Sequence, residues 1–321
     1  MSTSHLHQYA HVLVAYDGST AATAALQWAR VLTRRLVARL TIVIVQEPGQ
    51  PPTRLAPLSQ PPARAGLREV HVVTNGTPWR RLLIEASARD VDLIVIGKRG
   101  DSQQTARRVG RNSARVATRA LVPTLLVPRG SEVPAETPHI LLATDLLGGI
   151  AHGAAGIAML AKALSATVEV LHVNVPMEQQ ALPFSGRPPA GEINDARVER
   201  ELEALLQQLT ARASLATGVR ISARLRSASS VSACIAREAH AAADMLVLGT
   251  RPHRAFGVAW LGALTTKVLR EVQRPLLLLP PELPSESAQP SAAVLDGQRG
   301  GGVHGHRHYE PSPGSRRRRD F

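Results

Sequence analysis

Aromatic residues are scarce in this sequence, and cysteine occurs once. Phe, Trp and Tyr together make up 3% of the 321 residues, whereas Ala, Leu and Val are plentiful. The predicted core is therefore aliphatic, which suits parallel strands that are covered by helices on both faces. Because Cys234 is the only cysteine, no intrachain disulfide and no cysteine-based zinc site can form. A reducing cytoplasm is the expected location.

Long apolar segments are also missing. Residues 146–161 form the least charged long window, but this window is rich in Gly and Ala and is too short to span a bilayer. Residues 1–18 contain no basic region followed by an apolar core, so the sequence predicts no secretory signal. We therefore expect no membrane span.

Lysine is rare, and the positive charge is unevenly distributed. Lys occurs only at positions 98, 162 and 267, so nearly all of the net charge of +13 comes from Arg. Residues 1–135 hold 18 Lys and Arg against 8 Asp and Glu, whereas residues 136–280 hold 14 against 12. Two interpretations stay open: the first half binds an anion, or its cationic faces are merely solvated.

The sequence contains two copies of one unit, about 130 residues apart. An apolar run at residues 11–16 ends at Asp17, and a matching run at residues 139–144 ends at Asp145. Two later pairs also match, residues 92–97 with 244–249 and residues 122–128 with 274–280. These matches predict two tandem domains, at residues 8–130 and 136–281.

Short apolar runs alternate with longer stretches of helical periodicity in each unit. This alternation predicts an α/β fold in which β-α-β crossovers build an open twisted parallel sheet of five strands per unit, flanked by helices. Thr77 followed by Pro78 predicts one helix start, and Ser230 predicts the equivalent start in the second unit.

The two units differ in one crossover. Residues 45–70 are rich in Pro and Gly, which predicts a loop in place of a helix. The second unit has a predicted helix at residues 193–216, whose apolar residues show helical spacing. These residues are Val198, Leu202, Leu205, Leu206 and Leu209.

Residues 282–321 form a Pro-, Ser- and Gly-rich tail that we predict to be disordered. His304, His306 and His308 could chelate a transition metal, and the arginines at 316–319 could bind nucleic acid or anionic lipid nonspecifically. The alternative is a tail that only solubilises the chain. Cys234 and His240, in an Ala-rich helix, are read as packing or surface residues.

A glycine pattern follows the apolar run at residues 92–96. Gly97, Gly100 and Gly110 have the spacing Gly-x2-Gly-x9-Gly, which differs from both the Walker loop and the dinucleotide-binding turn. Glycines at the end of a strand let backbone amides approach an anion, and a following helix adds its unsatisfied N–H groups. The pattern therefore favours a phosphate site, although glycines in such a place can also be simple turn residues.

This pattern resembles the nucleotide loop of the universal stress protein family, and the resemblance covers most of residues 8–280. Further matches are Asp17-Gly18-Ser19 after the first strand and Asn75-Gly76-Thr77-Pro78 before a helix. The resemblance implies a Rossmann-like sheet of strand order 3-2-1-4-5, similar to that of the adenine nucleotide alpha hydrolases. It also implies binding of ATP, with or without Mg²⁺.

The resemblance assigns a role to each candidate residue. Asp17 is expected near the ribose and adenine, where a carboxylate can accept hydrogen bonds from ribose hydroxyls, or it simply caps the first helix. Ala15 and Val45 are expected to line the base pocket. The phosphates are expected to lie among Gly97, Lys98, Gly100, Gly110, Arg111, Asn112 and Ser113. Arg111 departs from the Ser or Thr that is typical of the family's nucleotide binders, and its guanidinium could contact phosphate instead.

The loop of the second unit has lost parts of the pattern. Gly249 and Gly262 are present, but Pro252 replaces the middle glycine and Ala263 replaces the hydroxyl residue. Proline offers no N–H and fixes φ. We expect the second unit to be mainly structural, with weak nucleotide binding as the alternative.

The expected function is that of an ATP-binding stress-response regulator, which associates with itself or with regulatory proteins. The alternative is a nucleotide-free interaction scaffold of the same fold. No catalytic set accompanies the loop, so we expect no enzyme, or at most very slow ATP hydrolysis. No metal site is predicted, and nucleic acid is expected to bind only nonspecifically through the tail. The closing strands at residues 124–127 and 276–279 are expected to pair within the chain, as a pseudo-dimer.

Overall fold

The structure, a computed structural model, describes residues 9–47, 69–100, 109–133, 137–144, 150–175, 195–250, 253–255 and 258–280. The structural statements that follow concern these residues. The predicted crossover loop before residue 69 and the predicted tail lie outside them. Asp145, which follows the first strand of the second unit, also lies outside the described residues, and so does Pro252 of the second glycine loop.

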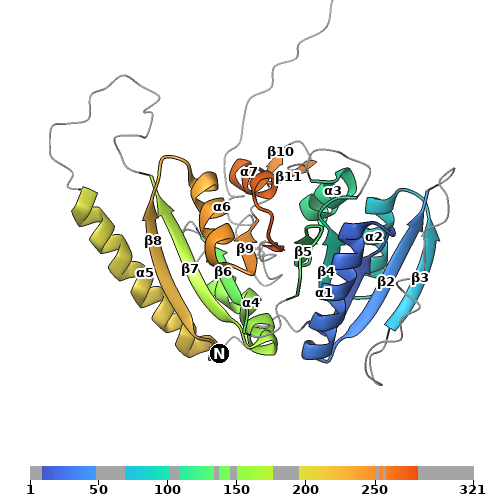
Figure 1. Ribbon diagram of the computed structural model, residues 1–321, viewed down its shortest axis with the longest axis horizontal. Coiled ribbons are helices and arrows are strands. Elements are labelled where there is room, and N and C mark those ends of the chain that lie inside the picture. Colours follow the sequence, from blue (N-terminus) through green and yellow to red (C-terminus); the bar gives the residue numbers. More distant parts are fainter. Residues whose placement is uncertain are drawn as a thin grey trace, which may run out of the picture. The chain divides into compact units, whose positions relative to one another are not determined.

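Helices and strands alternate along both halves of the chain (Figure 1). The first repeat contains β1 (His11–Ala15), α1 (Thr20–Leu36), β2 (Arg39–Gln46), β3 (Glu69–Asn75), α2 (Pro78–Ala88), β4 (Leu93–Gly97), α3 (Arg111–Arg119) and β5 (Thr124–Val127). The second repeat begins with β6 (His139–Ala143), α4 (Ile150–Leu164), β7 (Thr167–Asn174), α5 (Asp195–Thr217) and β8 (Ile221–Ser227). It continues with α6 (Val231–Ala242), β9 (Met245–Gly249), β10 (His253–Ala255), β11 (Val258–Trp260), α7 (Ala263–Glu271) and β12 (Leu276–Leu279).

The predicted fold class and strand order are confirmed. The main sheet has the order β3-β2-β1-β4-β5-β12-β9-β6-β7-β8, so each half reads 3-2-1-4-5 from its outer strand inward. The two five-stranded halves join edge to edge into one sheet of ten strands. The joint is the antiparallel pair of β5 and β12, which satisfies the free backbone groups of two short apolar edges.

Helices cover both faces of this sheet. α1, α4 and α5 pack on one face, where Val12 and Val14 point. α2, α3, α6 and α7 pack on the other face, where Leu13 points, because side chains alternate along a strand. The aliphatic core that was predicted from the composition therefore lies in two layers.

The two repeats also share local hydrogen bonds. The carboxylate of Asp92 accepts a hydrogen bond from the backbone N–H of His11 at 2.9 Å, and Asp244 accepts one from that of His139 at 2.8 Å. The helix-start predictions hold, since α2 begins at Pro78 and the hydroxyl of Ser230 caps α6. The hairpin of β10 and β11 was not predicted.

Candidate functional site

The candidate residues gather where β1 and β4 end. These strands are neighbours in the sheet, and Ala15 pairs with Ile96 in the parallel register. Asp17 follows β1 by two residues, and its carboxylate is exposed. A Cβ placed on Gly100 would lie 3.7 Å from the Oδ2 atom of Asp17. The aspartate and the glycine loop therefore face each other at the carboxyl edge of the sheet, where ligands bind in open α/β folds.

Asp17 also takes part in the turn that leads into α1. Its Oδ1 atom accepts a hydrogen bond of 3.0 Å from the backbone N–H of Ser19. Ser19, and not Asp17, caps the helix, because its hydroxyl accepts the N–H of Ala22 at 3.2 Å. This arrangement leaves Oδ2 on the side of the glycine loop.

Gly97 has a packing role of its own. A Cβ on this residue would lie 2.8 Å from the backbone carbon of Ala21 and 2.9 Å from the backbone nitrogen of Ala22. Real Cβ atoms do not approach backbone so closely, so only glycine lets the first turn of α1 pack against the end of β4. The glycine is therefore explained by helix packing whether or not a phosphate binds.

The third glycine of the pattern starts α3. Gly110 is the N-cap residue, and its N–H donates a 2.9 Å hydrogen bond to the carbonyl of Lys98. The hydroxyl of Ser113 donates to the carbonyl of Gly97 at 2.7 Å, which ties the helix to the end of β4. A Cβ on Gly110 would come within 3.3 Å of this hydroxyl oxygen. The two described ends of the loop are thus held close together.

Among the described residues, no side chain caps the start of α3. The first N–H groups of a helix have no partner within the helix, and they carry the positive end of its dipole. Arg111 is exposed at the first helical position, and Asn112 beside it is partly exposed. The helix start therefore offers backbone donors and a guanidinium to an anion.

Two apolar candidates lie on one face of the neighbouring strands. Ala15 at the end of β1 and Val45 near the end of β2 are partly buried against the core under α2. Ala15 pairs with Val43, so Val45 lies one step further along the same face. This placement suits a flat apolar surface beside Asp17.

Lys98 points away from these residues. Its side chain is 3% exposed, and its Nζ atom donates a short hydrogen bond to the carbonyl of Val272, which ends α7 in the second repeat. Burial lowers the pKa of Lys98 to about 8. The structure thus brings Asp17, Gly100 and Gly110 together but turns the Lys98 ammonium toward the other repeat.

The two glycines of the equivalent second loop have more space around them within the described residues. Among those residues, no atom lies within 4 Å of where a Cβ on Gly249 or Gly262 would be. Thr250 stands where the first repeat has Lys98, and its hydroxyl donates to the carbonyl of Leu279 at 3.0 Å. Gly262 starts α7 without a side-chain cap, as Gly110 starts α3.

Both repeats match the family model of the universal stress protein family, at residues 8–128 and 137–280. The chain belongs to the universal stress protein family. As a universal stress protein it has a fold shared with solved structures, among them a universal stress protein from Archaeoglobus fulgidus DSM 4304. That structure has 15% identity and a TM-score of 0.63, over 86% of this chain and 100% of the other.

Two structures from Pseudomonas aeruginosa have a similar fold. A putative universal stress protein from strain UCBPP-PA14 has 16% identity and a TM-score of 0.62, over 87% of this chain and 95% of the other. A functionally unknown protein from strain PAO1 has 15% identity and a TM-score of 0.62, over 86% of this chain and 94% of the other. No curated protein matches the chain.

Two further findings concern metal ligands and membrane spans in the described part of this universal stress protein. Within that part, no group of three or more His, Cys, Asp or Glu side chains could hold a metal ion. None of the described helices is both long enough and apolar enough to cross a membrane.

One surface feature of this universal stress protein was missed in the sequence. Trp79 on α2 lies among three guanidiniums, those of Arg80, Arg115 and Arg119. The signal was available, because Arg111, Arg115 and Arg119 follow one another at four-residue spacing on one helix.

Proposed function

We propose that this universal stress protein binds ATP in its first repeat and acts as a cytoplasmic stress-response regulator. Nucleotide occupancy would change how it docks on itself or on regulatory partners. The observation that carries the proposal is the meeting of three features at one edge of the sheet: the exposed carboxylate of Asp17, the glycine loop and the uncapped start of α3.

The described residues fit the parts of a nucleotide. The Oδ2 atom of Asp17, which lies on the side of Gly100, can accept hydrogen bonds from ribose hydroxyls. Ala15 and Val45 provide apolar surface for the base. Gly97, Gly100 and Gly110, with Asn112 and Ser113, form the loop and helix start for the phosphates.

Arg111 supplies the charge in this arrangement. It is exposed beside the helix start, and a guanidinium can hold phosphate with two parallel hydrogen bonds. Lys98 contributes to the site through its backbone, since its ammonium is held by Val272. If Mg²⁺ accompanies ATP, phosphate oxygens and water are expected among its ligands.

We propose binding with at most very slow hydrolysis. Efficient phosphoryl transfer needs a group that positions water and further groups that neutralise the developing charge. Asp17 is a carboxylate at the loop, but its Oδ1 atom is engaged by the N–H of Ser19. The expected role is therefore that of a sensor and not that of a catalyst.

Isothermal titration of ATP and AMP into the full chain tests the proposal with two matched variants. Gly110→Ala places a Cβ 3.3 Å from the Ser113 hydroxyl, whereas Gly262→Ala changes the equivalent residue where space is open. Both are N-cap residues, so the cost to the helix is similar. We expect ATP binding to weaken by about tenfold or more in Gly110→Ala only, which is about 1.4 kcal/mol. Absence of ATP binding by the parent chain would contradict the proposal.

A nucleotide-free scaffold is the second candidate, and one observation favours it. The side chains of Ser113 and Lys98 already have partners inside the protein, the carbonyls of Gly97 and Val272. A loop that is satisfied in this way can serve only to join α3 to the sheet. Loss of stability in Gly110→Ala, without ATP binding by the parent chain, would favour the scaffold.

A further inference from the structure

α2 and α3 are neighbours in the first repeat (Figure 1), and exposed arginines of both helices gather about Trp79 to form a cationic surface. We call it the arginine ridge, and it consists of Trp79, Arg80, Arg111, Arg115 and Arg119. All four arginines are exposed. The three on α3 are four residues apart, which places one guanidinium about every 6 Å along the helix.

Trp79 organises the ridge. The guanidinium carbons of Arg119, Arg80 and Arg115 lie 4.9, 5.2 and 5.6 Å from the centre of the indole ring. A guanidinium that rests against an aromatic ring is held in place by cation–π attraction but keeps its N–H donors. The indole therefore fixes three cations and leaves their hydrogen-bonding edges available.

Among the described residues, no neighbouring acid neutralises the positive charge of the ridge. α3 contains no Asp or Glu, and Glu85, the single acid of α2, pairs with Arg89 at 3.0 Å and Arg81 at 3.9 Å. In the part of the chain that the structure describes, none of the four ridge arginines forms an ion pair with a carboxylate. Like charges held side by side in this way favour an anionic partner.

We propose that the arginine ridge binds nucleic acid through its phosphodiester backbone, without regard to base sequence. A basic stripe along a helix is the electrostatic footprint of such binding. Every nucleotide of a nucleic acid strand carries a phosphate, at about 3.4 Å intervals along each strand of a duplex, so several phosphates lie within reach of the ridge whatever the base sequence. A protein partner would instead require an apolar centre within the contact surface, and the ridge has only one partly buried indole.

The ridge shares Arg111 with the proposed nucleotide site, but its other members can be tested apart from that site and from the predicted tail. Arg115 and Arg119 lie beyond the glycine loop, on the second and third turns of α3. Substitution of these two residues therefore tests the ridge without changing a residue assigned to the nucleotide site.

The test is fluorescence anisotropy of the full chain with a labelled single strand of about 20 nucleotides of mixed sequence, at several salt concentrations. The double variant Arg115→Gln and Arg119→Gln is compared with Arg212→Gln and Arg220→Gln, two exposed arginines of the second repeat. A third variant changes the arginines at 316–319 to Gln. Circular dichroism checks that each variant is folded.

We expect the ridge variant to bind about tenfold more weakly and to lower the salt slope of binding by about 1.4, since each lost phosphate contact on a single strand removes about 0.7. The Arg212 and Arg220 control should bind like the parent chain. An unchanged ridge variant, or a loss that appears only in the tail variant, would overturn the proposal. Equal affinity for a poly-glutamate peptide of the same charge would also overturn it, and would assign the ridge to acidic proteins.

Discussion

At the scale of single residues, Lys98 shows how a loop side chain can serve the fold. It lies between the first two glycines of the Gly-x2-Gly-x9-Gly pattern, yet its ammonium is buried and donates a hydrogen bond to the carbonyl of Val272 in the second repeat. Nearby, His240 accepts the backbone N–H of Gln273 at 2.9 Å. The pKa of His240 is lowered by burial first, and then by the charges of Arg274 and Lys98.

The buried ammonium of Lys98 predicts a rise in stability at alkaline pH. Burial lowers its pKa from 10.5 to about 8, so between these values the unfolded chain binds more protons than the folded chain. Stability therefore increases with pH in this window, by up to about 3 kcal/mol at 1.36 kcal/mol per pH unit. In urea unfolding from about pH 7 to pH 10.5, stability should rise by this amount relative to Lys98→Met, both in the parent chain and in Lys162→Met, whose side chain is exposed. The same rise in Lys98→Met would refute the assignment to Lys98.

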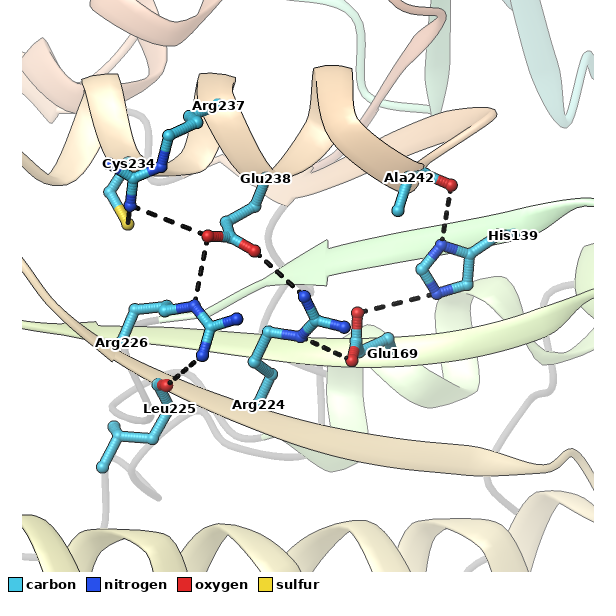
Figure 2. Close-up of polar contacts among 9 residues, drawn as sticks. All are labelled: His139, Glu169, Arg224, Leu225, Arg226, Cys234, Arg237, Glu238 and Ala242. Carbon is cyan, nitrogen blue, oxygen red and sulfur yellow. Dashed lines mark hydrogen bonds and ion pairs between the residues drawn. The ribbon is translucent and has the colours of Figure 1, made fainter.

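At the scale of elements, β3 and β8 occupy equivalent places but distribute their charges differently. Val72 pairs with Val43 in the first repeat, and Arg224 pairs with Leu171 at the same register in the second. In the second repeat this face of β8 therefore carries the guanidiniums of Arg224 and Arg226, which need carboxylate partners. Figure 2 shows Arg224 between Glu169 and Glu238, at 2.7 and 3.0 Å.

Glu238 on α6 is the centre of this network. It also accepts a hydrogen bond from Arg226 at 3.1 Å, and Arg237 lies 3.7 Å away. Burial alone would raise the pKa of Glu238, but the hydrogen bonds from Arg226 and Arg224 lower it overall. His139 approaches the other end of the network, 3.6 Å from Glu169. The network therefore fastens α6 to β7 and β8.

Glu238→Gln should destabilise the chain more than the matched change Glu85→Gln. Both residues lie eight positions after the N-cap of their helix, but Glu85 makes only pairs within one helix, worth about 0.5 kcal/mol. We expect a loss of about 1–2 kcal/mol for Glu238→Gln at neutral pH, reduced by the exposure of Arg226.

The pH dependence provides the check on this network. A lowered carboxyl pKa contributes stability above the unfolded pKa, and that contribution disappears as the pH falls through the folded pKa. The difference between the parent chain and Glu238→Gln, measured by urea unfolding, should therefore shrink in acid. Equal losses for the two variants at neutral pH would argue against a special role for Glu238.

Periodicity made the elements predictable, whereas contacts between distant segments were not. The short apolar runs and the helical spacing of residues 193–216 identified strands and helices, including α5, because burial imposes those periods. The direction of the Lys98 side chain depends on α7, far away in sequence. The contact of Gly97 with Ala21 depends on how α1 packs. The local sequence pattern contains no information on either of these two contacts.

At the scale of the whole molecule, the joint between the repeats decides how the chain unfolds. β5 is paired on both sides, with β4 in parallel and with β12 antiparallel. Leu125 and Leu277 face each other across the joint and are fully buried, and they belong to one core that continues through both repeats. The predicted internal pairing of the closing strands is confirmed, and it couples the two halves.

We therefore expect residues 9–280 to unfold in a single cooperative transition. If one repeat unfolded alone, the closing strand of the other would lose its partner, and the apolar surface of the common core would be exposed to water. Exposure of this surface would cost several kcal/mol of free energy, on the order of 25 cal/mol per Å². Differential scanning calorimetry should give a calorimetric enthalpy equal to the van't Hoff enthalpy. Hydrogen exchange should place the amides of β5 and β12 among the slowest, since they open only on global unfolding. Two resolved heat-absorption peaks, or fast exchange in β12 with slow exchange in β1, would show that the repeats are independent.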